Sequence, residues 1–224
     1  MSYKLIIGNK RYSSWSLRAW LLFGPHDIQF DAELVPFFTS EFDKFRTGNF
    51  PARQVPTLIA TVDGREIKVW DSMAIAEYLH ERHPDSGIWP REPDARAAAR
   101  CVTAEMHSSF SALRNTMPMN LCRAYTSFQP DAETIMEIER IEALWKWVRD
   151  TYGNGGPYLF GKKFCAADAF YAPVAARFQT YGIKLSAQSR QYANALLTHP
   201  DTHEFYEGAR QEKGIVPHYE FDIA

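Results

Sequence analysis

Cysteine is scarce in this chain, and its three copies lie far apart in the sequence. Cys101, Cys122 and Cys165 form neither a CxxC pair nor the ligand spacing of a zinc site. This pattern excludes the disulfide framework of small secreted domains. We therefore expect a protein of a reducing compartment, the cytoplasm, with no metal.

Long apolar runs and an excess of one charge are also missing. Near the amino terminus only Leu5, Ile6 and Ile7 are consecutive large apolar residues, too few for a secretory signal, and no run approaches transmembrane length. The net charge is −2, with both signs mixed along the chain. This excludes a basic stripe for nucleic acid and a polybasic segment for a membrane surface. We expect a soluble protein that binds neither.

The first part of the chain alternates between strand-like and helix-like patterns. The expected strands are Tyr3–Ile7, Ile28–Val35, Thr57–Val62 and Ile67–Trp70, and the expected helices are Leu17–Phe23, Thr39–Asn49 and Met73–His83. The order is βαβ, then α, then ββα. This is the thioredoxin-like α/β arrangement.

The pattern changes after His83. Residues 84–93 contain three prolines and a glycine, which is typical of a linker between domains. The chain beyond them is helical in pattern throughout, with helices expected at Asp94–Met117, Asp131–Tyr152, Cys165–Tyr181, Ser186–Leu197 and Asp201–Gln211. We predict a thioredoxin-like domain at 1–83, a linker at 84–93 and an all-α domain at 94–224.

One short segment, Gln54-Val55-Pro56-Thr57-Leu58, places a proline directly before a strand. Proline cannot donate a hydrogen bond to a sheet, so its position at a strand entrance has meaning. A trans peptide that merely starts the strand is the more frequent case. A cis peptide would turn the backbone of Val55 outward, where its N–H and C=O can pair with an extended peptide.

Four motifs together resemble those of the cytosolic glutathione transferases, over nearly the whole chain. They are Tyr12-Ser13-Ser14-Trp15-Ser16-Leu17-Arg18, Gln54-Val55-Pro56-Thr57-Leu58, Asp71-Ser72-Met73-Ala74-Ile75 and Phe164-Cys165-Ala166-Ala167-Asp168. The double serine is similar to that of the serine-type classes, near zeta. The resemblance implies a cis Pro56, glutathione as co-substrate, a small electrophile as second substrate, and a homodimer.

The resemblance also implies a serine that activates the glutathione thiol. A serine hydroxyl at a helix start can donate to sulfur, and the free N–H groups there favour an anion. The first serine of the pair, Ser13, matches the family position, while the spacing to the following arginine suits Ser14, so both stay candidates. The alternative is that both are simple helix caps.

The implied glutathione site draws on two further motifs. The main chain of Val55, next to Pro56, is expected to pair with the cysteinyl backbone as an added strand. Ser72 at a helix start suits the γ-glutamyl carboxylate, and Asp71 suits the ammonium or acts as a plain cap. Gln54, and more weakly Arg53, are expected to reach the other carboxylate.

The second substrate is expected between the serine loop and the first long helix. Candidate pocket residues are Trp15, Met106, His107, Phe110, Arg114 and Arg177. Met106, Phe110 and Arg114 fall at helical spacing, so a core role for the Met and Phe is the main alternative. Arg177 suits a substrate carboxylate or an acid at an interface.

Two departures from the family pattern limit what is implied. Trp15 stands where the zeta signature has a cysteine, which weakens a maleylacetoacetate-isomerase function. Cys165 replaces the usual Ser or Thr cap before Asp168, and sulfur is a weak acceptor for the Asp168 amide. A glutathione transferase is the first hypothesis, a zeta-like isomerase the second, and a non-catalytic glutathione-binding or assembly protein the third.

Overall fold

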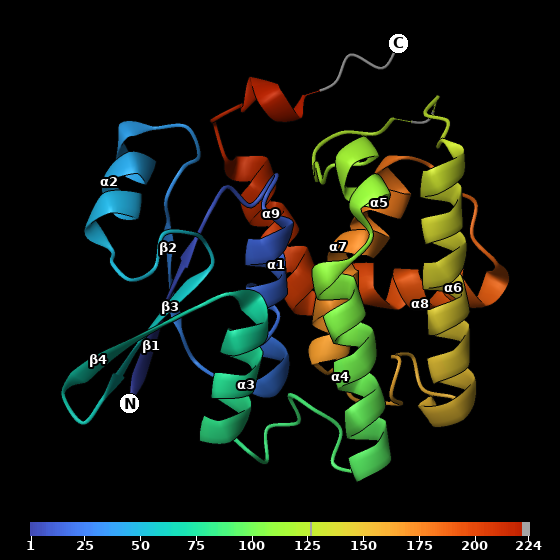
Figure 1. Cartoon of the computed structure of the whole chain (residues 1–224), viewed down its shortest axis with the longest axis horizontal. Helices are drawn as coiled ribbons and strands as arrows, with labels where there is room; N and C mark the ends of the chain where they lie inside the picture. Colours follow the sequence, from blue (N-terminus) through green and yellow to red (C-terminus); the bar gives the residue numbers. More distant parts are fainter. Residues whose placement is uncertain (126, 221–224) are drawn as a thin grey trace.

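The computed structural model describes residues 1–125 and 127–220, and Figure 1 shows two parts side by side. The first part has the strands β1 (Ser2–Ile7), β2 (Asp31–Leu34), β3 (Thr57–Val62) and β4 (Arg65–Trp70), and the helices α1 (Ser14–Trp20), α2 (Ser40–Gly48) and α3 (Ser72–Arg82). The second part is helical, with α4 (Pro93–Ser108), α5 (Ser111–Thr116), α6 (Ala132–Tyr152), α7 (Ala166–Thr180), α8 (Ala187–Leu197) and α9 (Pro200–Gln211). Short 3₁₀ turns lie at Gly24–His26 and Pro217–Tyr219.

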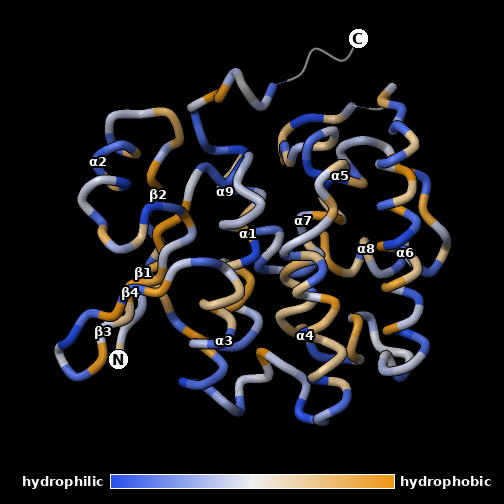
Figure 2. The backbone as a smooth tube through the Cα atoms, in the orientation of Figure 1, coloured by the Kyte–Doolittle hydropathy of each residue, from blue (hydrophilic) through white to orange (hydrophobic). Residues whose placement is uncertain are grey.

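The sheet is mixed, with the strand order β2-β1-β3-β4. Strand β1 pairs in parallel with β2 and antiparallel with β3, which in turn pairs antiparallel with β4. Figure 2 shows the hydrophobic residues gathered along β1 and β3, as expected of central strands. The predicted α/β part followed by an all-α part is therefore confirmed.

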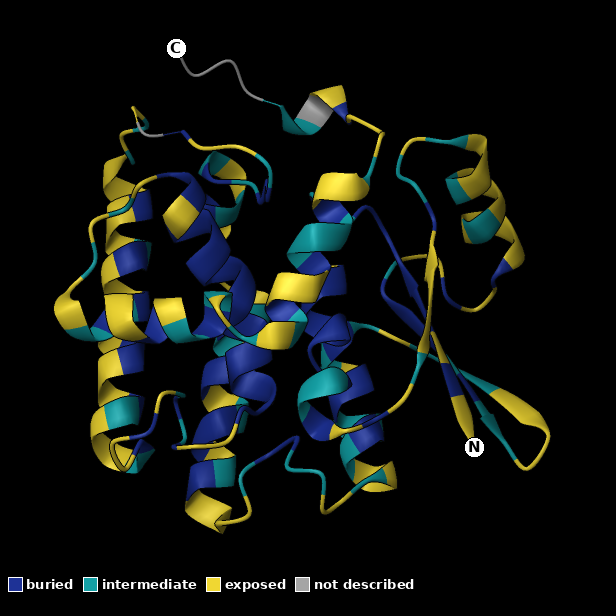
Figure 3. Ribbon diagram, turned by 180° about the vertical axis from the view of Figure 1, so that it is seen from behind, coloured by how far each residue is buried: buried dark blue, intermediate teal, exposed yellow. Residues whose placement is uncertain are grey.

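The two parts share one core. Helices α1 and α3 lie between the sheet and the helical part, and α1 packs directly on α7 (Figure 1). Nearly every residue of α7 is buried, as its apolar sequence predicts. Figure 3 shows the buried residues concentrated where the helices of the two parts meet. Any group at the start of α1 therefore lies against the helical part.

Three details of the predicted elements need correction or confirmation. The single helix expected over Asp94–Met117 is wrong, because the chain breaks between α4 and α5, where Phe110 has a positive φ of 65°. The guanidinium of Arg114 holds this break by donating to the carbonyls of Met106 and Ser109.

Strand β2 is shorter than the predicted Ile28–Val35. The Val55–Pro56 peptide is cis, as the resemblance implied.

The start of α7 is organised by the buried carboxylate of Asp168. It accepts hydrogen bonds from the amide of Leu159 at 3.1 Å, the amide of Cys165 at 2.9 Å and the hydroxyl of Tyr192 at 2.9 Å. The expected shortage of an acceptor for the Asp168 amide is wrong, because that amide donates to the Cys165 carbonyl at 3.0 Å. The weak sulfur cap therefore leaves no donor unpaired.

We predict that Asp168→Ala lowers the free energy of unfolding by roughly 3 kcal/mol or more, because it strands three buried donors. Tyr192→Phe removes only one of these bonds together with its donor, so its effect should be about 1 kcal/mol. Urea unfolding of both variants measures the difference. Equal midpoints for Asp168→Ala and the wild type would contradict the role of this carboxylate.

Candidate functional site

The serine loop follows β1 and turns tightly before α1. The carbonyl of Asn9 accepts from the amides of Tyr12 and Ser13, at 3.1 and 2.8 Å. Ser13 then caps the helix, since its Oγ accepts from the Ser16 amide at 3.2 Å and shares a hydrogen bond with Ser16 Oγ at 2.7 Å. Ser13 Oγ is thus engaged at the helix start as an acceptor, and either hydroxyl of the Ser13–Ser16 pair can be the donor between them.

Ser14, the first residue of α1, has a different environment. Its Oγ accepts from Nη2 of Arg177 at 3.3 Å, and Nε of the same arginine donates to the Met117 carbonyl at 2.7 Å. Because a hydroxyl that accepts from a cation keeps its own hydrogen, Ser14 can still donate to an anion. The Ser14 hydroxyl hydrogen therefore has no acceptor among the described residues, whereas that of Ser13 is free only when Ser16 is the donor of their shared bond.

A cleft of about 380 Å³ lies beside the start of α1, lined by Trp15, Gln54, Val55, Pro56, Asp71 and Ser72. Among the described residues, neither the N–H nor the C=O of Val55 has a hydrogen-bond partner. The buried Oγ of Ser72 has none either. Buried hydroxyls are normally paired, and this one lies in a cleft where a ligand could supply the missing partner.

Asp71 joins the cleft to the helical part. It has a positive φ of 77° and caps α3, with Oδ1 accepting from the amides of Met73 and Ala74 at 2.8 and 3.4 Å. Its Oδ2 lies 3.2 Å from Nε2 of His107, at the end of α4. Burial lowers the pKa of His107, and the Asp71 carboxylate partly opposes that effect.

Three arginines lie close to the start of α1. Two of them approach the ring of Trp15, and the third, Arg177, bonds to the hydroxyl of Ser14. The guanidinium carbons of Arg18 and Arg114 lie 4.4 and 5.0 Å from the Trp15 ring centroid. Burial lowers the pKa of Arg177 to about 9, and the neighbouring Arg114 adds to this. The site is therefore strongly electropositive beneath the serines.

The structure brings most of the predicted site residues together. Ser14, Trp15, His107, Arg114 and Arg177 form one connected group beside the cleft. It contains Arg18 as well, which the sequence reasoning missed. The available signal was its spacing, because Arg18 lies one helical turn after Ser14 in an otherwise apolar stretch.

Three predicted residues lie elsewhere. Met106 and Phe110 are core residues with exposed fractions of 0% and 5%. Met106 lies on the buried face of α4, and Phe110 stands at the break between α4 and α5. Arg53 is exposed and lines a neighbouring hollow with Arg46 and Phe50, not the cleft. Gln54 does line the cleft.

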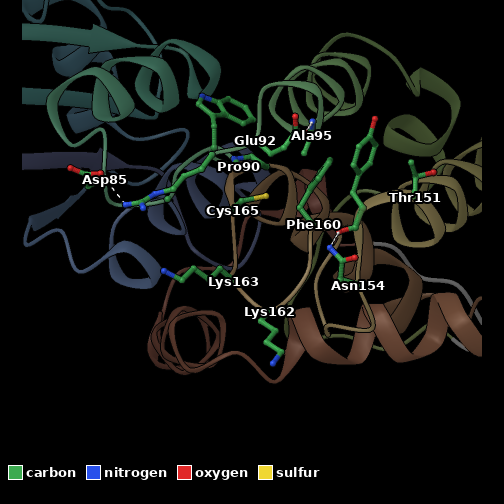
Figure 4. Close-up of a pocket in the computed structure, with 14 residues that line it drawn as sticks. Asp85, Pro90, Glu92, Ala95, Thr151, Asn154, Phe160, Lys162, Lys163 and Cys165 are labelled. Carbon is green, nitrogen blue, oxygen red and sulfur yellow. Dashed lines mark hydrogen bonds and ion pairs between the residues drawn. The ribbon is translucent and has the colours of Figure 1, made fainter.

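A larger hollow of about 470 Å³ lies apart from the serines, between the segment that joins the two parts and the loop before α7. Figure 4 shows Pro90, Phe160 and Cys165 around it, with the side chains of Lys162 and Lys163 nearby. None of the groups that surround Ser14 line this hollow, so it is distinct from the candidate site.

Neither a metal cluster nor a membrane span was found in the part of the chain that the structure describes. No three His, Cys, Asp or Glu side chains come together there in a way that would hold a metal ion. No helix within those ranges is long and apolar enough to cross a membrane.

Comparison with known proteins adds relatives in both sequence and fold. Residues 12–82 match the family model described as glutathione S-transferase, N-terminal domain. A probable maleylacetoacetate isomerase of Caenorhabditis elegans is 27% identical over 175 residues, 78% of each chain. The maleylacetoacetate isomerase of Rattus norvegicus is 30% identical over 144 residues, which is 64% of this chain and 62% of the rat protein.

Solved structures agree in fold. A glutathione transferase homologue from Burkholderia, with bound glutathione, superposes with a TM-score of 0.69 at 20% identity, covering 95% of this chain and all of that one. The maleylacetoacetate isomerase of Anaeromyxobacter dehalogenans gives a TM-score of 0.68 at 22% identity, covering 95% and 97%. At these identities the likeness concerns the fold alone.

We predict that Asp71→Asn lowers the pKa of His107 further, because it removes the carboxylate that favours the imidazolium. Asparagine still caps a helix, so α3 should persist. The His107 pKa is measured by NMR titration, with Asp85→Asn as a control that removes an exposed carboxylate paired with Arg91. A His107 pKa that rises or stays constant in Asp71→Asn would show that the pair does not interact.

Proposed function

This chain belongs to the glutathione transferase family, near its zeta class, and we propose that it transfers glutathione to a small electrophile after ionising the thiol at the start of α1. The observation that carries this proposal is the junction of Ser14, held by the buried Arg177, with a cleft that contains unpaired Val55 main-chain groups. The first group suits a sulfur anion and the second suits a peptide. Glutathione offers both.

The residues of the cleft fit the tripeptide. Val55 has a free donor and acceptor for the cysteinyl backbone, in the manner of an added strand. The orphaned Oγ of Ser72 and the Ser72 amide, the one amide of the first turn of α3 that Asp71 does not engage, suit the γ-glutamyl carboxylate. Asp71 suits the ammonium, and Gln54 the remaining carboxylate. Arg53 has the weaker claim to that carboxylate, because it lines the neighbouring hollow.

The proposed role of the serine is to lower the pKa of the glutathione thiol. A free thiol has a pKa of about 8.5, so only a few per cent is thiolate at pH 7. Lowering that pKa by two units takes about 2.7 kcal/mol of preferential stabilisation of the anion. One hydrogen bond from Ser14, the Trp15 amide, which has no partner among the described residues, and the nearby arginines are sources of that size. The proton leaves to water, and the sulfur attacks the electrophile.

Isomerisation of a carboxylate-bearing substrate is the second candidate. Arg114 and Arg177 next to the serine favour it, since guanidinium groups bind carboxylates in pairs of hydrogen bonds. The isomerase names of the sequence relatives point the same way. The tryptophan at position 15, in place of the cysteine of the zeta signature, is against it. Assays with a haloaromatic acceptor and with a cis-dicarboxylate substrate separate the two activities.

We also propose that the protein acts as a cytoplasmic homodimer, because symmetric pairs are the commonest oligomers and the family resemblance favours one. Sedimentation at micromolar concentration is expected to give the mass of two chains. A monomer under those conditions would contradict the proposal.

We predict that Ser14→Ala raises the pKa of bound glutathione by roughly one unit and lowers turnover about tenfold, with little change in affinity. A hydroxyl that donates to sulfur acts on the anion more than on the neutral thiol. Ser13→Ala is the matched comparison. It removes a helix cap and should cost about 1 kcal/mol of stability, with a smaller effect on the thiol.

Ultraviolet absorbance of the thiolate against pH measures the first effect, and urea unfolding the second. If Ser14→Ala kept the wild-type pKa of bound glutathione and Ser13→Ala raised that pKa, the activating role would belong to Ser13. Normal ionisation in both variants would rule out a serine mechanism.

A further inference from the structure

Arg18, in the middle of α1, is fully buried and has no hydrogen-bond partner within the described residues. Its exposed fraction is 0%, and Nε, Nη1 and Nη2 are all without an acceptor. A guanidinium carries five donors and stays protonated in proteins. Buried charges are normally paired, so a completely unpaired one in a core requires an explanation.

The aromatic surroundings of Arg18 stabilise it only in part. Its guanidinium carbon lies 4.4 Å from the ring centroid of Trp15 and 5.2 Å from that of Phe170. Such contacts favour a cation but replace neither its hydration nor its hydrogen bonds. No carboxylate forms an ion pair with it among the described residues.

The charged groups around Arg18 leave a net positive potential. Burial lowers its pKa, and the like charges of Arg114 and Arg177 act in the same direction. The acid that opposes them is Asp71, which is already engaged by His107 and by the amides of α3. The neighbouring hydroxyl of Tyr171 donates to a backbone carbonyl and brings no negative charge.

The geometry directs this potential toward Ser14. Ser14 and Arg18 are four residues apart on α1 and so lie on the same face of the helix. That side of α1 packs on α7, which supplies both Phe170 and Arg177, and Arg177 bonds directly to Ser14 Oγ. The missing negative charge would therefore be supplied by an anion at the helix start.

We propose that Arg18 is the buried counter-charge of the glutathione thiolate. It acts through the potential it creates at Ser14 and makes no contact with sulfur. The inference rests on the proposed function and assigns part of the thiol ionisation to a residue outside the cleft. When the S–H bond breaks, the electron pair stays on sulfur, the proton passes to water, and the charge of Arg18 is balanced.

This role separates activity from stability. An unpaired buried charge destabilises the ligand-free protein, so replacing it by an apolar side chain of similar length should not weaken the fold. The same replacement should make the thiol harder to ionise. An arginine retained for packing or hydrogen bonding would give the opposite pattern, with a weaker fold and an unchanged thiol.

The test compares Arg18→Met, Arg18→Lys and the control Arg140→Met, which removes an exposed arginine paired with Glu105. Thiolate absorbance against pH is measured with saturating glutathione, and urea unfolding is measured without it. Arg18→Met should raise the pKa of bound glutathione by about one unit, Arg18→Lys by less, and Arg140→Met by nothing measurable. The unfolding midpoint of Arg18→Met should equal or exceed that of the wild type.

Two results would overturn the inference alone. One is an unchanged thiol pKa in Arg18→Met while the wild type ionises bound glutathione. The other is an unfolding midpoint of Arg18→Met clearly below that of the wild type. Should Arg18→Met fail to fold, that failure counts as the second result, and Arg18→Lys still reports on the thiol. A wild type that neither binds glutathione nor lowers its thiol pKa would overturn the proposed function itself.

Discussion

The contact between α1 and α7 is the constraint on which the candidate site depends. It joins the sheet-containing part to the helical part through one core, and it buries Ser14 and Arg18. Removal from water strengthens every electrostatic interaction there, including the hydrogen bond from Arg177 to Ser14. It also means that the unpaired charge of Arg18 lowers the stability of the ligand-free fold. A surface serine loop would have neither property.

Both parts of the chain contribute groups to the candidate site. Val55 and Ser72 belong to the sheet-containing part and present unpaired groups suited to a peptide. Arg114 and Arg177 belong to the helical part and bring positive charge to the same place. Trp15 lies between the two sets, with His107 at its edge. Under the proposed function, the groups that bind the peptide and the charges that ionise the thiol are thus different residues of one site.

Much of the fold could be predicted from sequence, because it follows from local patterns. Alternation, turn residues and helix caps identified the strands and helices, and Asp131 and Ser186 cap α6 and α8 as their positions suggested. The break at Phe110 could not be predicted, since a bulky residue with positive φ has no local signal and depends on the contacts of Arg114. The expected single helix therefore misplaced Phe110, which stands at the break and is buried in the core.

Site residues that lie in short contiguous motifs could be predicted from the sequence. Site residues whose role depends on tertiary burial were missed. Val55 and Ser72 lie in short motifs, and their unpaired groups agree with the expected roles. The sequence matched Ser13 to the family position and kept Ser14 as a second candidate, and only the tertiary contact with Arg177 favours Ser14. Arg18 was missed because a charged residue in a helix is ordinarily solvated. Its burial depends on α7, some 150 residues further along the chain.

The most direct test of the account is proton release when the wild-type protein binds glutathione. Calorimetric titrations at pH 7 in buffers of different ionisation enthalpy give the number of protons released per ligand. Because a thiol that is mostly protonated in solution becomes mostly thiolate in the site, a pKa lowered by about two units predicts the release of roughly 0.7 proton for each glutathione bound at pH 7. Binding without proton release, or no binding, would contradict it.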